Sequence, residues 1–292
     1  MWDFEHSPLR EELATRYELQ WMLPSECADQ LATGQAEIGL IPIAALATNP
    51  HLRILPGCVI ASKGRVRSLL LVRRARQPLH QIRTVAADTA SRTTIAHSRI
   101  LFHKWGNPAA EFLPMAADLD AMLDRADAAI VIGDPALMAL EEQANRFERS
   151  GEELVYHDLA AEWKTLTGLP FVSAVWCCAH GGAAHGNPGA AHGDPAFGGS
   201  ESIGLQRAGL TFEEIAADFI RSRDHGLAHI DALVEEWNGR ITLPEETLRT
   251  YLTENIHYVL DEECVEAMKT FFRLAAECGV LPEYQLKEIE QA

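Results

Sequence analysis

Two apolar runs of strand length, at residues 67–73 and 171–177, constrain the fold of this chain more than any other feature. Through the first two thirds of the chain, including the part between these two runs, short strand-like runs alternate with helical ones, which predicts parallel sheets covered by helices. The predicted strands between the two runs are 83–88, 111–115 and 128–134, and the predicted helices are 93–106 and 119–126. The two apolar runs therefore bracket an inserted α/β domain. Such a design has a hinge and an interdomain cleft, a common place for a small-ligand site.

The host domain is predicted from the two ends of the chain. An amphipathic helix opens at Pro24 and stops at Gly34, and everything after residue 208 is predicted to be helical. The predicted strands of this part are 17–23, 37–42 and 54–62. The fold class is therefore α/β with two lobes, an interdomain cleft and a helical C-terminal region. Lobe 1 is predicted to comprise residues 1–70 and 172–292, and lobe 2 residues 71–171.

One segment, 179–203, is rich in Gly, Ala, His and Pro and contains a tandem echo, AAHGNPG and AAHGDPA. It carries too little apolar bulk to pack, which predicts a mobile surface insertion. Its histidines, His180, His185 and His192, raise the alternative of a metal site. Their irregular spacing implies no ordered ligand set, so no metal is predicted.

Charge limits the classes of partner. Acidic residues outnumber basic ones by 42 to 25, and the formal net charge is −17. That balance disfavours a surface that follows nucleic-acid phosphates. An anionic small substrate stays open, because helix N-termini and a few side chains can make a pocket locally positive.

The expected compartment is the cytoplasm, with no membrane partner. The start, MWDFEHSPLREEL, has scattered charges and no apolar stretch typical of a signal peptide, and no run approaches the roughly 20 apolar residues of a membrane span. The 6 cysteines form no C-x-x-C pair, which indicates reduced, mostly buried thiols. The oligomeric state is left open between monomer and homodimer.

The strongest candidate for an anion site is the segment DTASRTT at 88–94, at a predicted strand-to-helix junction. Hydroxyls and unpaired backbone N–H groups there converge at the positive end of a helix, which suits a carboxylate or phosphate. The candidate residues are Thr89, Ser91, Arg92, Thr93 and Thr94. The competing interpretation is ordinary helix capping by Ser91, which explains one hydroxyl but not the cluster.

A second turn of this kind is IGDPAL, where Gly133 permits the turn, Asp134 is predicted as N-cap and Pro135 as first helical residue. A capping Asp needs no catalytic role, so the alternative of a purely structural turn stands. Ser68 is either a cleft hydroxyl or a small interior residue. Arg65 and Arg67 are the nearest cations, although surface exposure is their commoner fate.

Other features exclude common enzyme classes. The chain has no G-x-S-x-G, H-E-x-x-H, P-loop or G-x-G-x-x-G after a strand, so serine hydrolase, zinc protease and nucleotide-binding functions lack their physical requirements. Trp163, Phe171 and Trp176 surround the TGLP turn, where they are predicted to be core residues rather than ligand stackers.

Several separate blocks, in order, resemble the chorismate dehydratase family of the futalosine route to menaquinone. They are GLIPIAAL (39–46), ILPGCVIASKGRVRSLLLV (54–72), DTASRTT (88–94), ADAAIVIGDPAL (126–137) and HDLAAEWKTLTGLPFVSAVW (157–176). The resemblance covers most of the chain. It implies the type 2 periplasmic-binding-protein fold, in agreement with the inserted domain inferred from the bracketing strands.

The resemblance also implies a reaction and a set of residues. The reaction is loss of water from chorismate to give 3-[(1-carboxyvinyl)oxy]benzoate, without a metal or organic cofactor. By matching position, Ser68, Ser91 and Thr93, beside Arg92, are candidates for carboxylate binding, and Gly133 and Asp134 would line the cleft. No side chain stands out as the general base, and a substrate carboxylate is the candidate for that role.

The beginning of the chain departs from the family pattern. Relatives carry a first strand of the form F/Y-L-N-x-x-P-L, and its Asn is thought to polarise the departing hydroxyl. Here that strand would precede Met1, so the predicted strands 17–23 and 37–42 are expected to lack the partner that lies between them. We therefore expect a natural chain longer by ~10–20 residues. The catalytic Asn is then outside this sequence.

Two further functions fit the same features. A non-catalytic solute-binding or sensor protein uses the same fold and the same helix-terminus sites. The related 1,4-dihydroxy-6-naphthoate synthase of the same pathway is the second, although its N-terminal S-P-C-P-N-D type motif is absent here.

Overall fold

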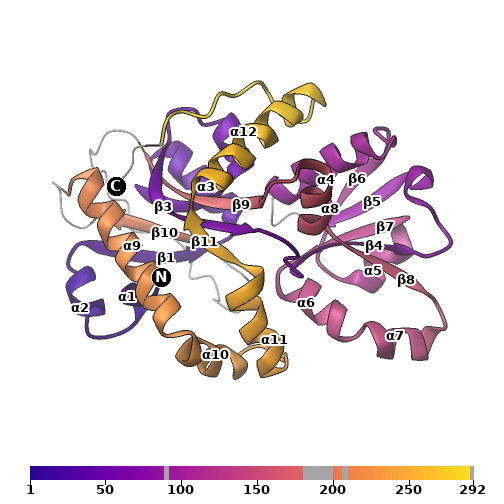
Figure 1. Ribbon diagram of the computed structural model, residues 1–292, viewed down its shortest axis with the longest axis horizontal. Coiled ribbons are helices and arrows are strands. Elements are labelled where there is room, and N and C mark those ends of the chain that lie inside the picture. Colours follow the sequence, from indigo (N-terminus) through magenta and orange to yellow (C-terminus); the bar gives the residue numbers. More distant parts are fainter. Residues whose placement is uncertain (89–91, 180–199, 206–209, 290–292) are drawn as a thin grey trace.

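The computed structural model describes residues 1–88, 92–179, 200–205 and 210–289. Figure 1 shows two β-sheets side by side, each flanked by helices. The first sheet has the order β1-β10-β2-β9-β3-β11, and the second has the order β6-β5-β7-β4-β8. The two-lobed α/β fold class is thereby confirmed. The lobe boundaries at 70/71 and 171/172 stay a prediction.

The strands of the first sheet come from both ends of the described chain. They are β1 (Tyr17–Met22), β2 (Ile38–Pro42), β3 (Arg53–Ser62), β9 (Phe171–Cys178), β10 (Ser200–Leu205) and β11 (His257–Leu260). Every neighbouring pair in this sheet is antiparallel. The expectation of a parallel sheet is therefore wrong for lobe 1, because β9 and β10 lie between strands that run the other way.

The strands of the second sheet lie between the two crossings. They are β4 (Leu69–Arg74), β5 (Thr84–Asp88), β6 (Glu111–Met115), β7 (Ala128–Ile132) and β8 (Leu154–Asp158). Strand β5 is parallel to β6 and β7, as the alternation of strands and helices predicted. Strand β4 pairs antiparallel with both β7 and β8, so the sheet is mixed.

Helices cover the faces of both sheets. Around the first sheet lie α1 (Trp2–Glu5), α2 (Arg10–Leu13), α3 (Pro24–Thr33), the 3₁₀ turn η1 (Ile43–Ala47), α9 (Phe212–Ala228), α10 (Ile230–Asn238), α11 (Glu245–Thr250) and α12 (Glu262–Glu277). Around the second lie the 3₁₀ turn η2 (Leu79–Gln81), α4 (Arg92–Lys104), α5 (Leu119–Arg125), α6 (Asp134–Glu141), α7 (Gln143–Ser150) and α8 (Leu159–Thr167). Helix α3 ends where predicted, because Gly34 has φ of 71° and so adopts the left-handed conformation that stops a helix.

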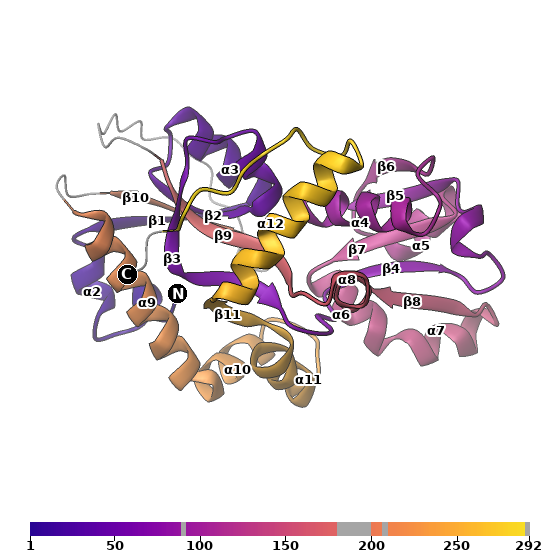
Figure 2. The same cartoon turned by 45° about the horizontal axis from the view of Figure 1, so that its top comes forward.

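One apolar core spans both sheets. The same cluster of buried side chains contains Ile41 and Val175 of the first sheet and Leu71 and Ile130 of the second. Helix α12 lies over the junction and reaches α4 (Figure 2), and Phe271 of α12 belongs to this cluster. The lobes are therefore packed against each other along the side where α4 and α12 meet.

The region after residue 208 is not all helical as expected. Strand β11 adds to the edge of the first sheet beside β3, with His257 opposite Ala61 and Val259 opposite Cys58. Its four residues, HYVL, are too short a run to stand out from the surrounding helical pattern.

Strand β10 corrects two expectations about lobe 1. Ser200–Leu205 pairs with all of β1 and, through Ser202 and Ile203, with β2. The strands 17–23 and 37–42 therefore do not lack a partner between them. The end of the predicted mobile insertion, 200–203, is also part of a sheet. The sequence SESIGL is half polar and follows a low-complexity run, so local pattern could not predict a strand there. The three histidines of the insertion lie outside the described residues.

The pairing of β10 predicts a strong effect of proline at position 203. Ile203 lies between β1 and β2. Its backbone N–H group therefore faces a neighbouring strand whichever way it points. Ile203→Pro should lower the free energy of unfolding by about 1–3 kcal/mol. Urea denaturation measures this, with Ser200→Pro as control, because Ser200 is the first residue of the strand and pairs only with β1. Equal midpoints for Ile203→Pro and the unchanged chain would show that β10 adds nothing to the sheet.

Candidate functional site

The segment that crosses from β3 to β4 is held by one buried carboxylate. Asp158 is 6% exposed, and its Oδ2 accepts hydrogen bonds from the N–H groups of Val66 at 3.0 Å and Arg67 at 2.7 Å. Its Oδ1 accepts from Ala160 at 3.1 Å and Ala161 at 3.0 Å, at the beginning of α8. The same side chain therefore caps a helix and fixes the hinge backbone.

Arg67 is strained. Its φ is 66°, a left-handed conformation that costs a non-glycine residue about 1–3 kcal/mol and that is concentrated at functional sites. The hydrogen bond from its N–H to Asp158 and the ion pair of its guanidinium with Glu141, 3.0 Å long, hold this conformation. Arg67 is thus bound to Glu141, and Arg65 is exposed. The strained residue sets the direction of the next one, Ser68.

Ser68 is 5% exposed and joins two distant parts of the chain. The Tyr251 hydroxyl donates to Ser68 Oγ at 3.1 Å, and the Ser68 carbonyl oxygen accepts from the Gly133 N–H at 2.8 Å. Burial raises the pKa of Tyr251, and the negative charge of Asp134 raises it further, so the phenol stays protonated and donates. Ser68, Gly133, Asp134 and Tyr251 form what we call the hinge cluster.

Asp134 differs from its predicted role. Gly133, with φ of 70° and ψ of −142°, occupies the N-cap position of α6, and Asp134 is the first helical residue, so Asp134 caps nothing. Within the described part of the chain its carboxyl group has no hydrogen bond or ion pair. Burial raises the pKa of Asp134, and no opposite charge offsets this effect. A half-buried carboxyl group of this kind is a candidate for proton transfer.

The predicted anion cradle lies elsewhere, at the contact between lobes. Thr93 is fully buried, and its Oγ1 accepts from the Ala44 N–H of η1 at 3.2 Å. Arg92 Nη2 lies 3.0 and 2.9 Å from the two carboxylate oxygens of Asp29 in α3. No described contact joins either residue to the hinge cluster, and Ser91 lies outside the described residues.

Tyr251 is the residue that the sequence did not indicate. It opens a π-helical turn, Tyr251–Asn255, that follows α11. Such turns are frequent at functional sites, but no local pattern announces one. Its neighbour in the site, Ser68, is 183 residues away in sequence.

A cavity of about 170 Å³ lies beside Tyr258 of β11, between the first sheet and helices α9 and α10. Its walls are mostly apolar, with Leu40 and Trp176 among them. Its polar members are Ser222, Arg223 and Tyr258. Burial and the neighbouring Tyr251 raise the pKa of Tyr258, which keeps this phenol neutral. The cavity suits an apolar ring with few polar groups.

One group of described side chains has metal-ligand chemistry, His257, Asp261 and Cys264. Asp261 Oδ2 already accepts from Lys63 Nζ at 2.6 Å and lies 3.0 Å from His257 Nε2, and its Oδ1 accepts from the Cys264 N–H at 2.9 Å. Burial raises the pKa of Cys264 to about 12, so the thiol is protonated. The group acts as a cap of α12 with an ion pair and does not fit a metal.

Two of the predicted core aromatics, Trp163 and Phe171, pack around a buried histidine, His97. Trp163, Phe171 and Trp176 are buried, as predicted. The His97 ring stacks between Phe171, at 3.9 Å, and Phe271, at 4.3 Å. Desolvation lowers the pKa of His97 to about 3, against the opposing effect of its hydrogen bond to the Thr93 carbonyl.

This depressed pKa predicts acid sensitivity. The folded state holds His97 neutral, while the unfolded chain protonates it below about 6.5, so stability is fully present above pH 6.5 and is lost as pH falls toward 3. The loss should be about 2 kcal/mol between pH 6.5 and 5. His97→Phe keeps a flat ring and should remove this part of the pH dependence in urea titrations. Parallel pH profiles of the two proteins would contradict it.

Two lobes joined by two crossings, with polar groups at the hinge, define a protein of the periplasmic-binding-protein fold class. Solved structures agree. A protein of Archaeoglobus fulgidus is 16% identical, with a TM-score of 0.57 over 89% of this chain and 85% of its own. The periplasmic aliphatic sulphonate binding protein of Escherichia coli is 14% identical, with a TM-score of 0.53 over 93% of this chain and 82% of its own. The chain belongs to the menaquinone biosynthesis family, whose model matches residues 3–277. Among the described helices, none is long and apolar enough to cross a membrane.

Proposed function

We propose that this protein is a chorismate dehydratase, a hydro-lyase that converts chorismate into 3-[(1-carboxyvinyl)oxy]benzoate in the futalosine route to menaquinone. The observation that supports this proposal most is the hinge cluster. In it the part-buried Ser68–Tyr251 hydrogen bond lies near the Asp134 carboxyl group, which has no hydrogen bond or ion pair within the described residues. Membership of a menaquinone biosynthesis family supports the choice of pathway. The resemblance of the separate sequence blocks supports the choice of reaction.

The reaction requires that the substrate is held in position and that one proton is removed from it. A base removes the proton at C3, which the conjugated carboxylate activates, and the hydroxyl at C4 leaves after it gains a proton. The products are water and an aromatic ring, so atoms balance without a redox partner. In this proposal Asp134 in its ionised form is the base, in place of a substrate carboxylate, and the Tyr251 hydroxyl turns from Ser68 to donate toward the leaving oxygen.

Substrate binding in this proposal uses both lobes. The backbone N–H groups at the beginning of α6 and the Ser68 hydroxyl suit one carboxylate. Ser91, Arg92 and Thr93 are assigned to the other, which requires Thr93 to exchange its contact with Ala44 for the ligand. We place the reaction in the cytoplasm, a compartment that suits six cysteines without a disulfide, all within the described residues.

One assay tests this function. The 292-residue protein is incubated with chorismate, and the product is followed by its aromatic absorbance and by the mass loss of one water. Formation of the aromatic enolpyruvyl ether supports the proposal. Tight binding of chorismate without turnover favours a solute-binding protein, which the likeness in fold to the sulphonate binding protein makes the second candidate. If the protein instead turns over the cyclic intermediate that 1,4-dihydroxy-6-naphthoate synthase uses at a later step of the pathway, it is that synthase.

A further inference from the structure

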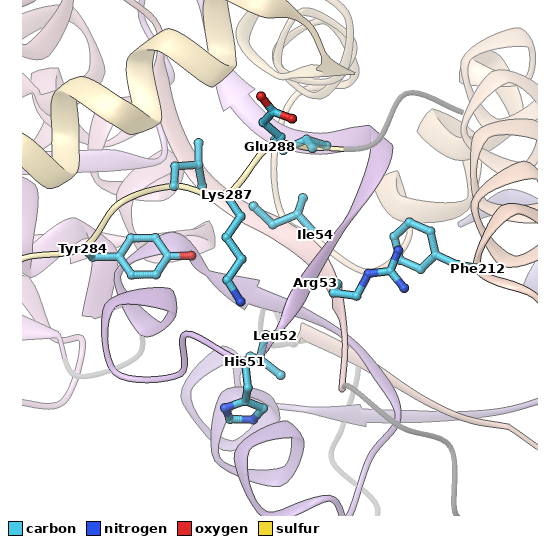
Figure 3. A pocket seen from close by; sticks show the side chains of 10 residues that line it. His51, Leu52, Arg53, Ile54, Phe212, Tyr284, Lys287 and Glu288 are labelled. Atoms are coloured by element: carbon cyan, nitrogen blue, oxygen red, sulfur yellow. The ribbon is translucent and has the colours of Figure 1, made fainter.

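A second cavity lies on lobe 1, apart from the hinge cluster (Figure 3). It has a volume of about 400 Å³, within the usual range of small-ligand sites. It lies between the chain around the beginning of β3 and the residues that follow α12. Leu52 and Ile54 are buried and supply apolar surface on the β3 side. The cavity shares no lining residue with the one beside Tyr258.

Positive groups gather at this cavity. The cationic side chains of Arg53 and Lys287 line it, together with the His51 imidazole and the Glu288 carboxylate, in a chain whose formal net charge is −17. Figure 3 shows the Lys287 ammonium and the Tyr284 hydroxyl pointing into the same space, while the Glu288 carboxylate points away from it. No salt bridge within the described residues involves Lys287 or His51. The local charge is therefore opposite to that of the whole molecule, which favours an anion.

The polar groups are held by aromatic contacts. The Tyr284 ring packs edge-on against the buried Phe272, with ring centroids 4.6 Å apart. Burial raises the pKa of Tyr284, so its hydroxyl remains a donor. The Arg53 guanidinium carbon lies 3.9 Å from the centroid of the Phe212 ring, and this stacked pair forms one flat wall.

We propose that this cavity is a second binding site, for a small aromatic anion. The aromatic body packs against Leu52, Ile54 and the stacked Arg53–Phe212 wall, and the phosphate, sulfonate or carboxylate head accepts hydrogen bonds from Lys287 and Tyr284. The site does not depend on the proposed dehydratase function, because none of its residues belongs to the hinge cluster.

Calorimetric titration with 1-naphthyl phosphate tests this site, and 1-naphthol is the neutral analogue. We expect one phosphate ester per chain, about tenfold weaker binding of 1-naphthol, and a Kd for the phosphate ester raised about tenfold or more by Lys287→Glu. Lys287 is exposed, so this variant should fold. Lys104→Glu makes the same change of charge on α4, away from the cavity, and Ser68→Ala changes the hinge cluster; both should leave the Kd within about twofold.

Three results would overturn the proposal. These are an unchanged Kd in Lys287→Glu, an equal loss in Lys104→Glu, and equal affinity for 1-naphthol. Loss of binding in Ser68→Ala would place the phosphate ester at the hinge cluster instead and would also reject the second site.

Discussion

Asp134→Asn is expected to reduce turnover of chorismate by about 100-fold or more, because the amide cannot accept the proton that the proposed reaction releases. Tyr251→Phe should lower turnover by about 10- to 100-fold through loss of the donated hydrogen bond near the leaving hydroxyl. The measurement is the rate of product formation at saturating chorismate. Asp124→Asn, an exposed carboxylate on α5, is the matched control and should retain full activity.

The stability of Asp134→Asn distinguishes a catalytic role of this carboxyl group from a structural one. Its folded-state pKa is raised, so the folded state disfavours the ionised form, and the charge costs stability at pH values above the raised pKa. Asp134→Asn should therefore be at least as stable as the unchanged chain at pH 7. Activity should rise with pH through the raised pKa. A variant that loses stability and activity together would point to a structural role for this carboxyl group.

The second large effect is expected at Asp158. Asp158→Ala should lower the free energy of unfolding by about 4 kcal/mol, because four backbone N–H groups lose their acceptor: those of Val66, Arg67, Ala160 and Ala161. Against a typical total of about 5–15 kcal/mol, this change threatens folding. Urea denaturation measures it.

Asp158→Asn distinguishes the two tasks of this side chain. The amide keeps one oxygen acceptor, enough for the cap of α8 or for the hinge but not for both. The loss should be about half of that in Asp158→Ala. The strained Arg67 would relax, and chorismate binding should weaken even where the variant folds. Stability within about 1 kcal/mol of the unchanged chain in Asp158→Ala would refute this account.

Apolar pattern predicted the elements whose structure is decided locally. Strand β6 and helices α3 and α5 have nearly the predicted bounds, and α3 ends at its predicted stop signal, Gly34. Strand β10 was not predicted, because its position depends on two strands more than 150 residues earlier and not on its own composition. Strand β11 was not predicted, because an edge strand of four residues has almost no recognisable apolar periodicity.

The roles of the candidate site residues stay predictions, although the structure shows where these residues lie. Ser68, Gly133 and Asp134 were expected near each other, and hydrogen bonds and charge bring them together. Thr93 and Arg92 were expected beside them, but they bridge the lobes, because a hydroxyl at a helix start bonds to whichever backbone N–H tertiary packing supplies. Tyr251 could not be predicted, since its role arises only when α11 folds back against the hinge.

The apolar core that spans both sheets restricts how a ligand can enter. Separation of the lobes on the side of α4 and α12 would expose Phe271 and its neighbours to water, so wide symmetrical opening is costly. On the opposite side, α6 and α11 meet through Glu141, which contacts Arg67 and Thr247 in exposed polar pairs that cost little to break. Ligands should therefore reach Ser68 when the lobes open on the side of α6 and α11 only. The rates of ligand binding and release should rise with ionic strength.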